Sequence, residues 1–317
     1  MQGPSVDFSG AALFKSAVAL HLGLRFDDDK LPFLDEILAR RVRARGKATS
    51  DYLRALIQDG PDPEELDALA EALTVTETYF FRGAEQFEAL ATEVLPSLRA
   101  SQGAGRIPRL LSAACASGEE PYSLAILLKE RFPDFLQEGT LLAVDMHPAM
   151  LKTALAGVYG SWSLRESPSH LRERYFRAAG KKFRLREDVR SAVRFEQRNL
   201  ADENADLWQE GSLDVIFCRN LLMYLEPESA VLLVGRMAQA LTPGGHLFLG
   251  HAETLRGLSR DFELCQTQGV FYYRRLAAGR QGADARTGWA WEGPPPLPRA
   301  SVEEALVRNP SWFEAIG

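Results

Sequence analysis

The 317-residue chain has a formal net charge of −6, with 37 lysines and arginines against 43 aspartates and glutamates. Hydrophobic residues make up 46% of it and charged residues 25%, a balance that excludes an intrinsically disordered chain. The net negative charge argues against a general affinity for nucleic acid, so we expect no nucleic-acid partner. The length favours one large domain with a smaller one.

Metal, redox and membrane classes are also disfavoured. Cys115, Cys218 and Cys265 are widely spaced and lack the C-x-x-C pairing of metal and redox sites. His251 has no second His or Cys at ligand spacing, so no metal is expected. No apolar run approaches the ~20 residues that span a membrane, and no secretory signal pattern opens the chain. We therefore expect a cytoplasmic protein without direct membrane insertion.

The pattern of apolar residues changes once along the chain. The first ~95 residues have apolar positions at helical spacing, which predicts helices at 7–22, 32–45, 50–58 and 63–73. From about residue 109 strands alternate with helices, which is typical of a doubly wound parallel sheet. The expected strands are 109–114, 140–145, 193–196, 213–218 and 246–250, followed by an antiparallel hairpin of 262–265 with 270–274.

These two patterns predict an α/β protein with an N-terminal helical domain and linker over 1–95 and a sheet domain over 96–276. A polar insert at 158–192 ends in alternating residues that favour a small antiparallel β appendage. Residues 277–299 are rich in Gly and Pro and are interpreted as a linker. Residues 300–317 predict an amphipathic helix, interpreted as the start of a further domain or a contact with a partner.

A turn of small residues follows the first expected strand and leads into Glu119 and Glu120. Small residues allow a ligand to approach the backbone. Two carboxylates suit the N-terminus of a helix, but they would repel the phosphate of a P-loop or dinucleotide site. The turn therefore favours a ligand with hydroxyls and positive charge, a description that S-adenosylmethionine meets with its ribose, ammonium and sulfonium.

Polar residues follow three other expected strands, at the edge where open α/β sheets bind ligands. Asp145 ends the second strand and is suited to accept hydrogen bonds from ribose hydroxyls; the alternative is a helix-capping aspartate. Asn199-Leu200 follows the third, as an adenine contact or a simple turn. Arg219, Asn220 and Tyr224 follow the fourth, and the alternative for Tyr224 is a packed ring with a satisfied hydroxyl.

Two segments of the N-terminal part complete the candidates. In residues 74–82 the aromatic side chains are expected to wedge the helical domain against the sheet, leaving Thr76, Thr78 and Arg82 toward a ligand. A basic cluster is expected either to dock an acidic partner or to form a solvated helix face. Its members are Arg40, Arg41, Arg43, Arg45 and Lys47.

Four motifs in register resemble the CheR family of chemoreceptor glutamate O-methyltransferases, which use S-adenosylmethionine. The likeness runs from about residue 10 to about residue 275 and includes a Pro-Gly-Gly turn and a His-Ala-Glu variant of the family's His-Ser-Glu run. The motifs are Glu77-Thr78-Tyr79-Phe80-Phe81-Arg82, Gly118-Glu119-Glu120-Pro121-Tyr122-Ser123, Asn199-Leu200 and Phe217-Cys218-Arg219-Asn220.

The resemblance implies a Rossmann-like class I methyltransferase sheet and a set of cofactor contacts. Arg82 and Tyr224 match positions beside the reacting methyl, and Thr76 stands where the family usually has Asn. One of Glu119 and Glu120 is implied to join the cofactor site, with Glu120 favoured. The other implied contacts are Thr78, Arg82, Asp145, Asn199, Leu200, Arg219 and Asn220.

The implied activity is methyl transfer to glutamate side chains on the cytoplasmic methylation helices of chemoreceptors, in chemotaxis-type adaptation, with S-adenosylhomocysteine as product. The stretch 178–182 is short and lacks the Gly-x-Gly insertion of members that hold a receptor tether, so independence of a tethering pentapeptide is expected. Two alternatives stay open: a methyltransferase of this fold on another acceptor, and an S-adenosylmethionine-binding sensor or scaffold of a signalling assembly.

Overall fold

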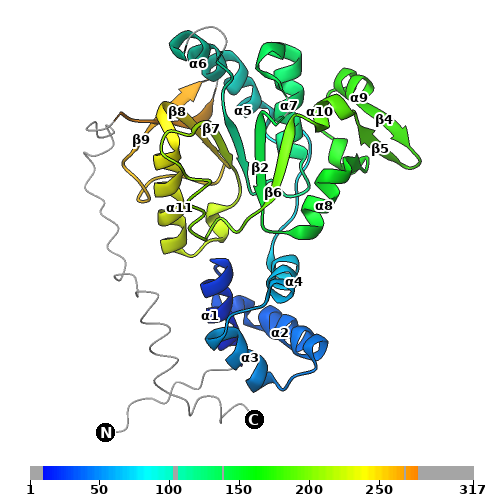
Figure 1. Cartoon of the computed structure of the whole chain (residues 1–317), viewed down its shortest axis with the longest axis vertical. Coiled ribbons are helices and arrows are strands. Elements are labelled where there is room, and N and C mark those ends of the chain that lie inside the picture. The colour runs from blue at the N-terminus through cyan, green and yellow to red at the C-terminus, as the bar shows by residue number, and fades with distance from the viewer. Residues whose placement is uncertain (1–9, 103–105, 138, 268, 278–317) are drawn as a thin grey trace. The chain divides into compact units, whose positions relative to one another are not determined.

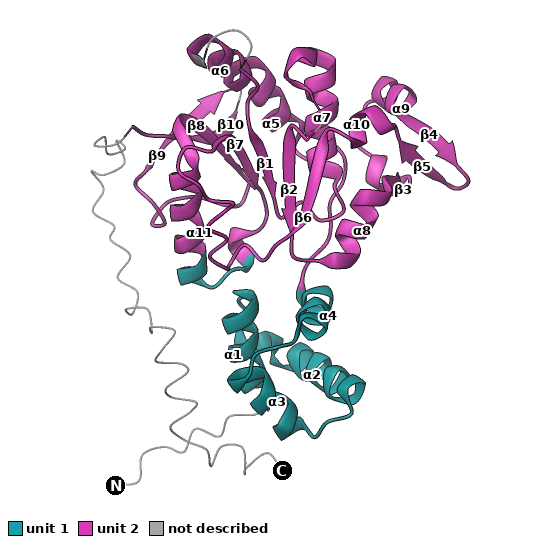
Figure 2. Ribbon diagram, in the orientation of Figure 1, with its two compact units in different colours: residues 1–73, 224–229, 291–317 teal, residues 74–223, 230–290 magenta. Residues whose placement is uncertain are grey.

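The computed structural model describes residues 10–102, 106–137, 139–267 and 269–277. The described residues form two compact units (Figure 2), the first made of 10–73 with 224–229 and the second of 74–223 with 230–277. The expected C-terminal helix at 300–317 and all but the first residue of the expected linker lie outside the described residues. None of the described helices is long and apolar enough to cross a membrane.

The first unit contains the four helices that the apolar spacing predicts. They are α1 (Gly10–Leu22), α2 (Leu31–Arg45), α3 (Thr49–Gln58) and α4 (Pro63–Leu73), with a 3-10 turn, η1 (Asp28–Lys30), before α2. Helix α2 ends at Gly46, whose φ of 61° is the left-handed conformation that favours glycine at a helix C-terminus. A distant segment joins this unit, because Leu24 forms an isolated antiparallel bridge with Leu225.

The second unit is built on a seven-stranded sheet of order β6-β2-β1-β7-β8-β10-β9 (Figure 1). Parallel pairing joins β6, β2, β1, β7 and β8 in that order, whereas β10 is antiparallel to both β8 and β9. This is the doubly wound sheet with an antiparallel hairpin that the sequence pattern predicts, and the Rossmann-like class I methyltransferase sheet that the resemblance implies. The strands are β1 (Leu110–Ala113), β2 (Leu141–Asp145), β6 (Val193–Gln197), β7 (Leu213–Cys218), β8 (Leu241–Leu249), β9 (Phe262–Thr267) and β10 (Val270–Arg275).

Helices connect and cover these strands. They are α5 (Ala84–Ala89), the π-helical turn η2 (Leu90–Val94), α6 (Leu95–Gln102), α7 (Glu119–Arg131), η3 (Pro133–Phe135), α8 (Pro148–Ala156), η5 (Leu222–Tyr224) and α11 (Pro227–Ala240). From β1 the chain proceeds through β2 to β6 on one side and then returns to β7 on the other. The carboxyl ends of β1 and β7 therefore flank the topological switch point, where such sheets bind ligands.

The expected β appendage is present as a three-stranded antiparallel sheet of order β3-β5-β4. Its elements are β3 (Val158–Tyr159), η4 (Trp162–Leu164), α9 (Ser169–Tyr175), β4 (Phe176–Ala179), β5 (Lys182–Leu185) and α10 (Glu187–Arg190). Phe80 is fully buried against it, with ring centroids 4.9 Å from Tyr159 and 5.0 Å from Phe176. The Phe80 ring therefore packs within the second unit. This differs from the sequence prediction, in which the aromatic side chains wedge the helical domain against the sheet.

Two boundaries differ from the sequence prediction. The units divide between Leu73 and Thr74, so α5 and η2 belong to the sheet unit and not to the helical one. Strand β8 begins at Leu241 instead of residue 246 and runs through the Pro-Gly-Gly turn. A register shift in β7 accompanies this, and the backbone approaches so closely that a Cβ on Gly245 would lie 3.0 Å from Asp214 O.

Candidate active site

The loop between β1 and α7 has an unusual backbone. Ala114 and Ala116 have φ values of 61° and 46°, a left-handed conformation that costs alanine energy, and Gly118 has φ of 91°. The loop is packed tightly, since a Cβ on Gly118 would lie 2.8 Å from Ala154 Cβ, and Tyr159 Oη donates a hydrogen bond to Ser117 O at 2.8 Å. The strained loop is therefore held in place by its surroundings.

Asp145 ends β2 beside this loop and is 9% exposed. Its Oδ2 accepts a hydrogen bond from Ala116 N at 2.7 Å and its Oδ1 from His147 N at 2.8 Å. Burial raises the pKa of the Asp145 carboxyl, and the backbone N–H donors oppose this effect. The capping residue of α8 is His147, so the helix-cap alternative for Asp145 does not hold. A carboxylate has about four acceptor sites, so the group keeps the capacity to accept a further hydrogen bond.

Glu119 and Glu120 are adjacent in sequence but have different surroundings. Glu119 is 2% exposed and accepts a hydrogen bond from Ser117 Oγ at 2.7 Å, within its own turn. Glu120 instead accepts one from Ser112 Oγ of β1 at 2.7 Å, and its Oε2 lies 3.4 Å from Arg219 Nη1. Burial raises the pKa of both carboxyls. Only Glu120 thus bridges β1 and the end of β7, at the switch point.

Arg219 follows β7 directly and is 7% exposed. Burial lowers the pKa of its guanidinium, while the charge of Glu120 acts in the opposite direction. Among the described residues its Nε is buried without a hydrogen-bond partner. A buried guanidinium whose donors are incompletely satisfied fits a ligand that supplies an acceptor group. Asn220, the next residue, has φ of 59°.

The segment before α5 brings Arg82 to the same place. Arg82 Nη1 donates a hydrogen bond to Glu77 O at 3.1 Å. Its charge opposes the rise that burial causes in the pKa of Glu120, and it adds to the lowering that burial causes in the pKa of Arg219. Gly83 follows with φ of 70°, and a Cβ there would lie 2.8 Å from Arg219 Nη2. Thr76 and Thr78 lie in the same segment and are partly exposed.

Asn199 lies beside Asp145, since the preceding Arg198 N donates a hydrogen bond to Asp145 O at 2.9 Å. The Asn199 side chain, however, serves its own turn: Oδ1 accepts from Ala201 N at 3.0 Å and Nδ2 donates to Asp202 Oδ1 at 3.2 Å. This is the turn alternative that the sequence left open. Leu200 is buried.

The remaining sequence-predicted residues, Tyr224 and the basic cluster, belong to the first unit. Tyr224 O accepts a hydrogen bond from Arg25 N at 2.8 Å, and Tyr224 is 37% exposed. That exposure does not fit the alternative of a packed ring. Of the basic cluster, Arg40, Arg43 and Lys47 are exposed.

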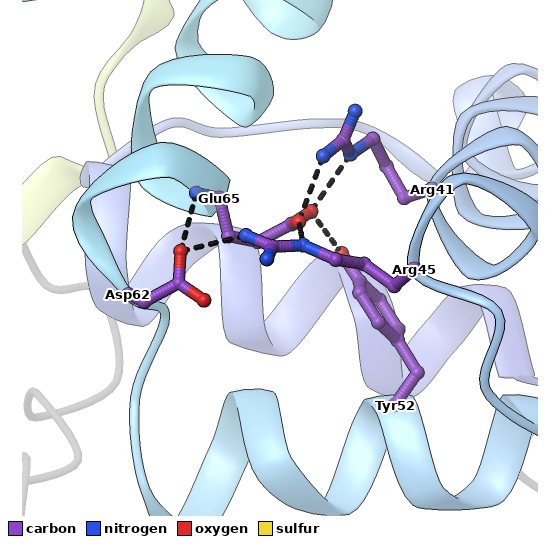
Figure 3. A network of polar contacts seen from close by, with 5 residues as sticks. All are labelled: Arg41, Arg45, Tyr52, Asp62 and Glu65. Carbon is purple, nitrogen blue, oxygen red and sulfur yellow. Dashed lines mark hydrogen bonds and ion pairs between the residues drawn. The ribbon is translucent and has the colours of Figure 1, made fainter.

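Two members of the basic cluster have internal partners (Figure 3). Arg41 Nε and Nη2 each donate to a different carboxylate oxygen of Glu65 at 2.7 Å, and Arg45 bonds Glu65 and Asp62. Tyr52 Oη donates to Glu65 at 2.8 Å. Burial raises the pKa of Glu65, but hydrogen bonds from Arg41, Arg45 and Tyr52 outweigh it and hold that pKa below its usual value. Arg41 and Arg45 therefore join α2 to α4, a structural role that the sequence prediction missed.

Sequence reasoning also missed residues that support the site. Ser112 bonds Glu120, Gly83 leaves room for the Arg219 guanidinium that a Cβ would obstruct, and Ser123 Oγ accepts a hydrogen bond from Phe81 N at 2.9 Å. The glycine directly after Arg82 was the local signal for this close approach. In the described part of the chain, no group of three or more His, Cys, Asp or Glu side chains could hold a metal ion.

Comparison with known proteins shows the family to which the chain belongs. Residues 76–271 match the CheR methyltransferase, SAM binding domain. Chemotaxis protein methyltransferase 2 of Vibrio cholerae is 36% identical over 76% of this chain and 84% of that protein. The probable biofilm formation methyltransferase WspC of Pseudomonas aeruginosa is 35% identical over 86% of this chain and 64% of that protein. The chain is a member of the CheR family of S-adenosylmethionine-dependent protein-glutamate methyltransferases.

Proposed function

We propose that the protein transfers a methyl group from S-adenosylmethionine to glutamate side chains of chemoreceptors, forming methyl esters in chemotaxis-type adaptation. The observation that carries the proposal is the convergence of Asp145, Glu120 and Arg219 at the switch point, with Arg82 beside them. The relatives from Vibrio cholerae and Vibrio parahaemolyticus are chemotaxis protein methyltransferases, which supports the receptor as the acceptor. The reaction then takes place in the cytoplasm, on the receptors' methylation helices.

The cofactor-binding roles follow from charge and hydrogen-bonding capacity. Asp145 offers its remaining acceptor capacity to the ribose hydroxyls. Glu120 offers a negative charge to the ammonium, and Arg219 offers its unpartnered Nε–H to the carboxylate of the methionine moiety. Asn220 and Leu200 line the same edge. The sulfonium supplies an electrophilic methyl group.

The chain needs no general base for this reaction. A glutamate has an ordinary pKa of about 4.3, so the acceptor is ionised at neutral pH. Catalysis then consists of aligning the carboxylate with the methyl group and excluding the water that shields it. We assign the orientation of the acceptor to Arg82 through charge-assisted hydrogen bonds, and a single orienting hydrogen bond to the Tyr224 hydroxyl.

Two features support the proposed mode of receptor binding. Arg40, Arg43 and Lys47 are exposed on and just after α2, and can attract an acidic methylation helix. Ala179 of β4 pairs directly with Lys182 of β5, so only two residues connect the two strands. So short a hairpin has no insertion to hold a tether, which supports independence of a tethering pentapeptide.

The experiment is methyl transfer from radiolabelled S-adenosylmethionine to purified cytoplasmic fragments of receptors. Glutamate methyl esters are released by mild alkali, whereas methyl groups on nitrogen are not. Alkali-labile label that is lost when the receptor glutamates are changed to glutamine supports the proposal. Alkali-stable label indicates another acceptor, and cofactor binding without transfer to any fragment indicates a sensor or scaffold.

A further inference from the structure

Asn220 has a backbone conformation that needs support. Its φ of 59° lies in the left-handed region, which costs a non-glycine residue energy unless its neighbours impose it. Its N–H donates a hydrogen bond at 2.7 Å to Glu253 Oε2. Glu253 lies beyond β8, 33 residues along the chain, so the contact joins two loops at the same sheet edge.

The Glu253 carboxylate also binds its own loop. The same Oε2 accepts a hydrogen bond from Gly250 N at 2.7 Å, and Oε1 lies 3.4 Å from Met223 N. The loops approach closely here, because a Cβ on Gly250 would lie 2.7 Å from Asn220 Nδ2 and 2.8 Å from Glu253 Oε2. One carboxylate oxygen therefore fixes the backbone after β7 and after β8 together.

Two other left-handed residues around the site are held in the same way. Phe81 N donates to Ser123 Oγ at 2.9 Å, and Ala116 N donates to Asp145 Oδ2 at 2.7 Å. In each case a side chain from elsewhere in the chain accepts the N–H of the strained residue. The backbone around the switch point is thus fixed by side-chain acceptors, and Glu253 is the acceptor for Asn220.

We propose that Glu253 is a positioning residue, which holds Asn220 and the end of β7 in the conformation that binds S-adenosylmethionine. The inference rests on the proposed cofactor contacts of Arg219 and Asn220. It assigns to Glu253 an effect on cofactor affinity exerted through hydrogen-bond geometry. A direct attraction between its charge and the positively charged cofactor is the competing explanation.

Three substitutions separate these explanations. Glu253→Gln keeps the length of the side chain and one acceptor oxygen for Asn220 and Gly250, but it removes the charge. Glu253→Asp keeps the charge and shortens the reach. Glu253→Ala removes both. Glu263→Ala on β9, where Glu263 pairs with Arg274 near the surface, is the matched control for loss of a glutamate.

The test is calorimetric titration of the full chain with S-adenosylhomocysteine, together with KM and kcat for S-adenosylmethionine. We expect Glu253→Ala to bind about tenfold or more weakly, with a similar rise in KM and a smaller change in kcat. Glu253→Gln should stay within about threefold of wild type, as should Glu263→Ala, and Glu253→Asp should resemble Ala. Where the alanine variant does not fold, the comparison of Gln with Asp decides.

Exchange of the Asn220 amide hydrogen gives a readout without ligand, and it should accelerate in the Ala and Asp variants alone. Unchanged affinity in Glu253→Ala, or a glutamine variant as weak as alanine, would overturn the positioning role. Failure of the wild-type chain to bind S-adenosylhomocysteine would refute the proposed function instead, so the two failures are distinct.

Discussion

The guanidinium of Arg219 lies 3.4 Å from the carboxylate of Glu120, and side-chain exposure is 4% for the arginine and 13% for the glutamate. The pair joins the first turn of α7 to the end of β7. Neighbouring Glu119, by contrast, is bonded to Ser117 within its own turn. Under the proposed function, this difference favours Glu120 as the cofactor contact.

Glu120→Gln is therefore expected to weaken S-adenosylhomocysteine binding by about tenfold, because it removes the negative charge beside Arg219. The fold should persist, since glutamine can still accept the hydrogen bond from Ser112. Glu119→Gln is the matched control and should change the affinity by less than about threefold. Calorimetric titration measures both, and a harmless Glu120→Gln beside a damaging Glu119→Gln would reverse the assignment.

Gly83→Ala is expected to displace Arg219. The new Cβ would lie 2.8 Å from Arg219 Nη2, so the guanidinium must move and cofactor affinity should fall. The positive φ adds a strain of about 1–2 kcal/mol. Gly257→Ala isolates that strain, because Gly257 also has a positive φ and its Cβ would meet nothing within 4 Å. Equal cofactor affinity in the two variants, measured beside their melting temperatures, would show that Gly83 does not constrain Arg219.

The network around Glu65 predicts a loss of stability in acid. The folded-state pKa of Glu65 lies below its ordinary value of 4.5, so its stabilising contribution is complete above that value and is lost as pH falls through the lower folded-state pKa. Glu65→Gln should lower stability by about 3 kcal/mol near neutral pH, because two arginines lose their charged partner.

Thermal unfolding of both chains between pH 6 and pH 3 measures this effect. The difference in melting temperature between wild type and Glu65→Gln should shrink toward acid pH. A difference that stays constant over this range would show that Glu65 does not carry the acid dependence.

The three exposed cations of the basic cluster are expected to act on the receptor alone. Reversing Arg40, Arg43 and Lys47 to glutamate should raise KM for receptor fragments and reduce its dependence on salt, with the affinity for S-adenosylhomocysteine unchanged. Arg41→Ala should instead lower the melting temperature, because it leaves Glu65 with fewer partners. A salt-independent KM in the wild type would argue against electrostatic docking.

Local patterns in the sequence predicted most of the elements. The helical spacing of apolar residues located α3 and α4 to within a residue, and short apolar runs located β2 and β7. The alternation in 158–192 also predicted the β appendage, but not that Phe80 packs against it. These features depend on residues that are neighbours in the chain, which is why a single sequence reveals them.

Contacts between distant segments could not be predicted in this way. Arg45 lies 20 residues before its partner Glu65, and the Leu24–Leu225 bridge spans most of the chain. The choice between Glu119 and Glu120 likewise depends on Ser112 and Arg219, which the fold brings together. Charge and motif alone placed all five members of the basic cluster on the surface. In the folded chain, two of them, Arg41 and Arg45, instead bond carboxylates of the same unit.

The most direct test of the account compares alkali-labile methyl transfer to receptor fragments by wild type, Arg82→Ala and Arg99→Ala. Arg99 pairs with exposed Asp134 and serves as the control for loss of an arginine outside the site. We expect Arg82→Ala to lose at least about a hundredfold in turnover while keeping its melting temperature, and Arg99→Ala to retain wild-type turnover. Near-normal transfer of alkali-labile methyl groups by Arg82→Ala would contradict it.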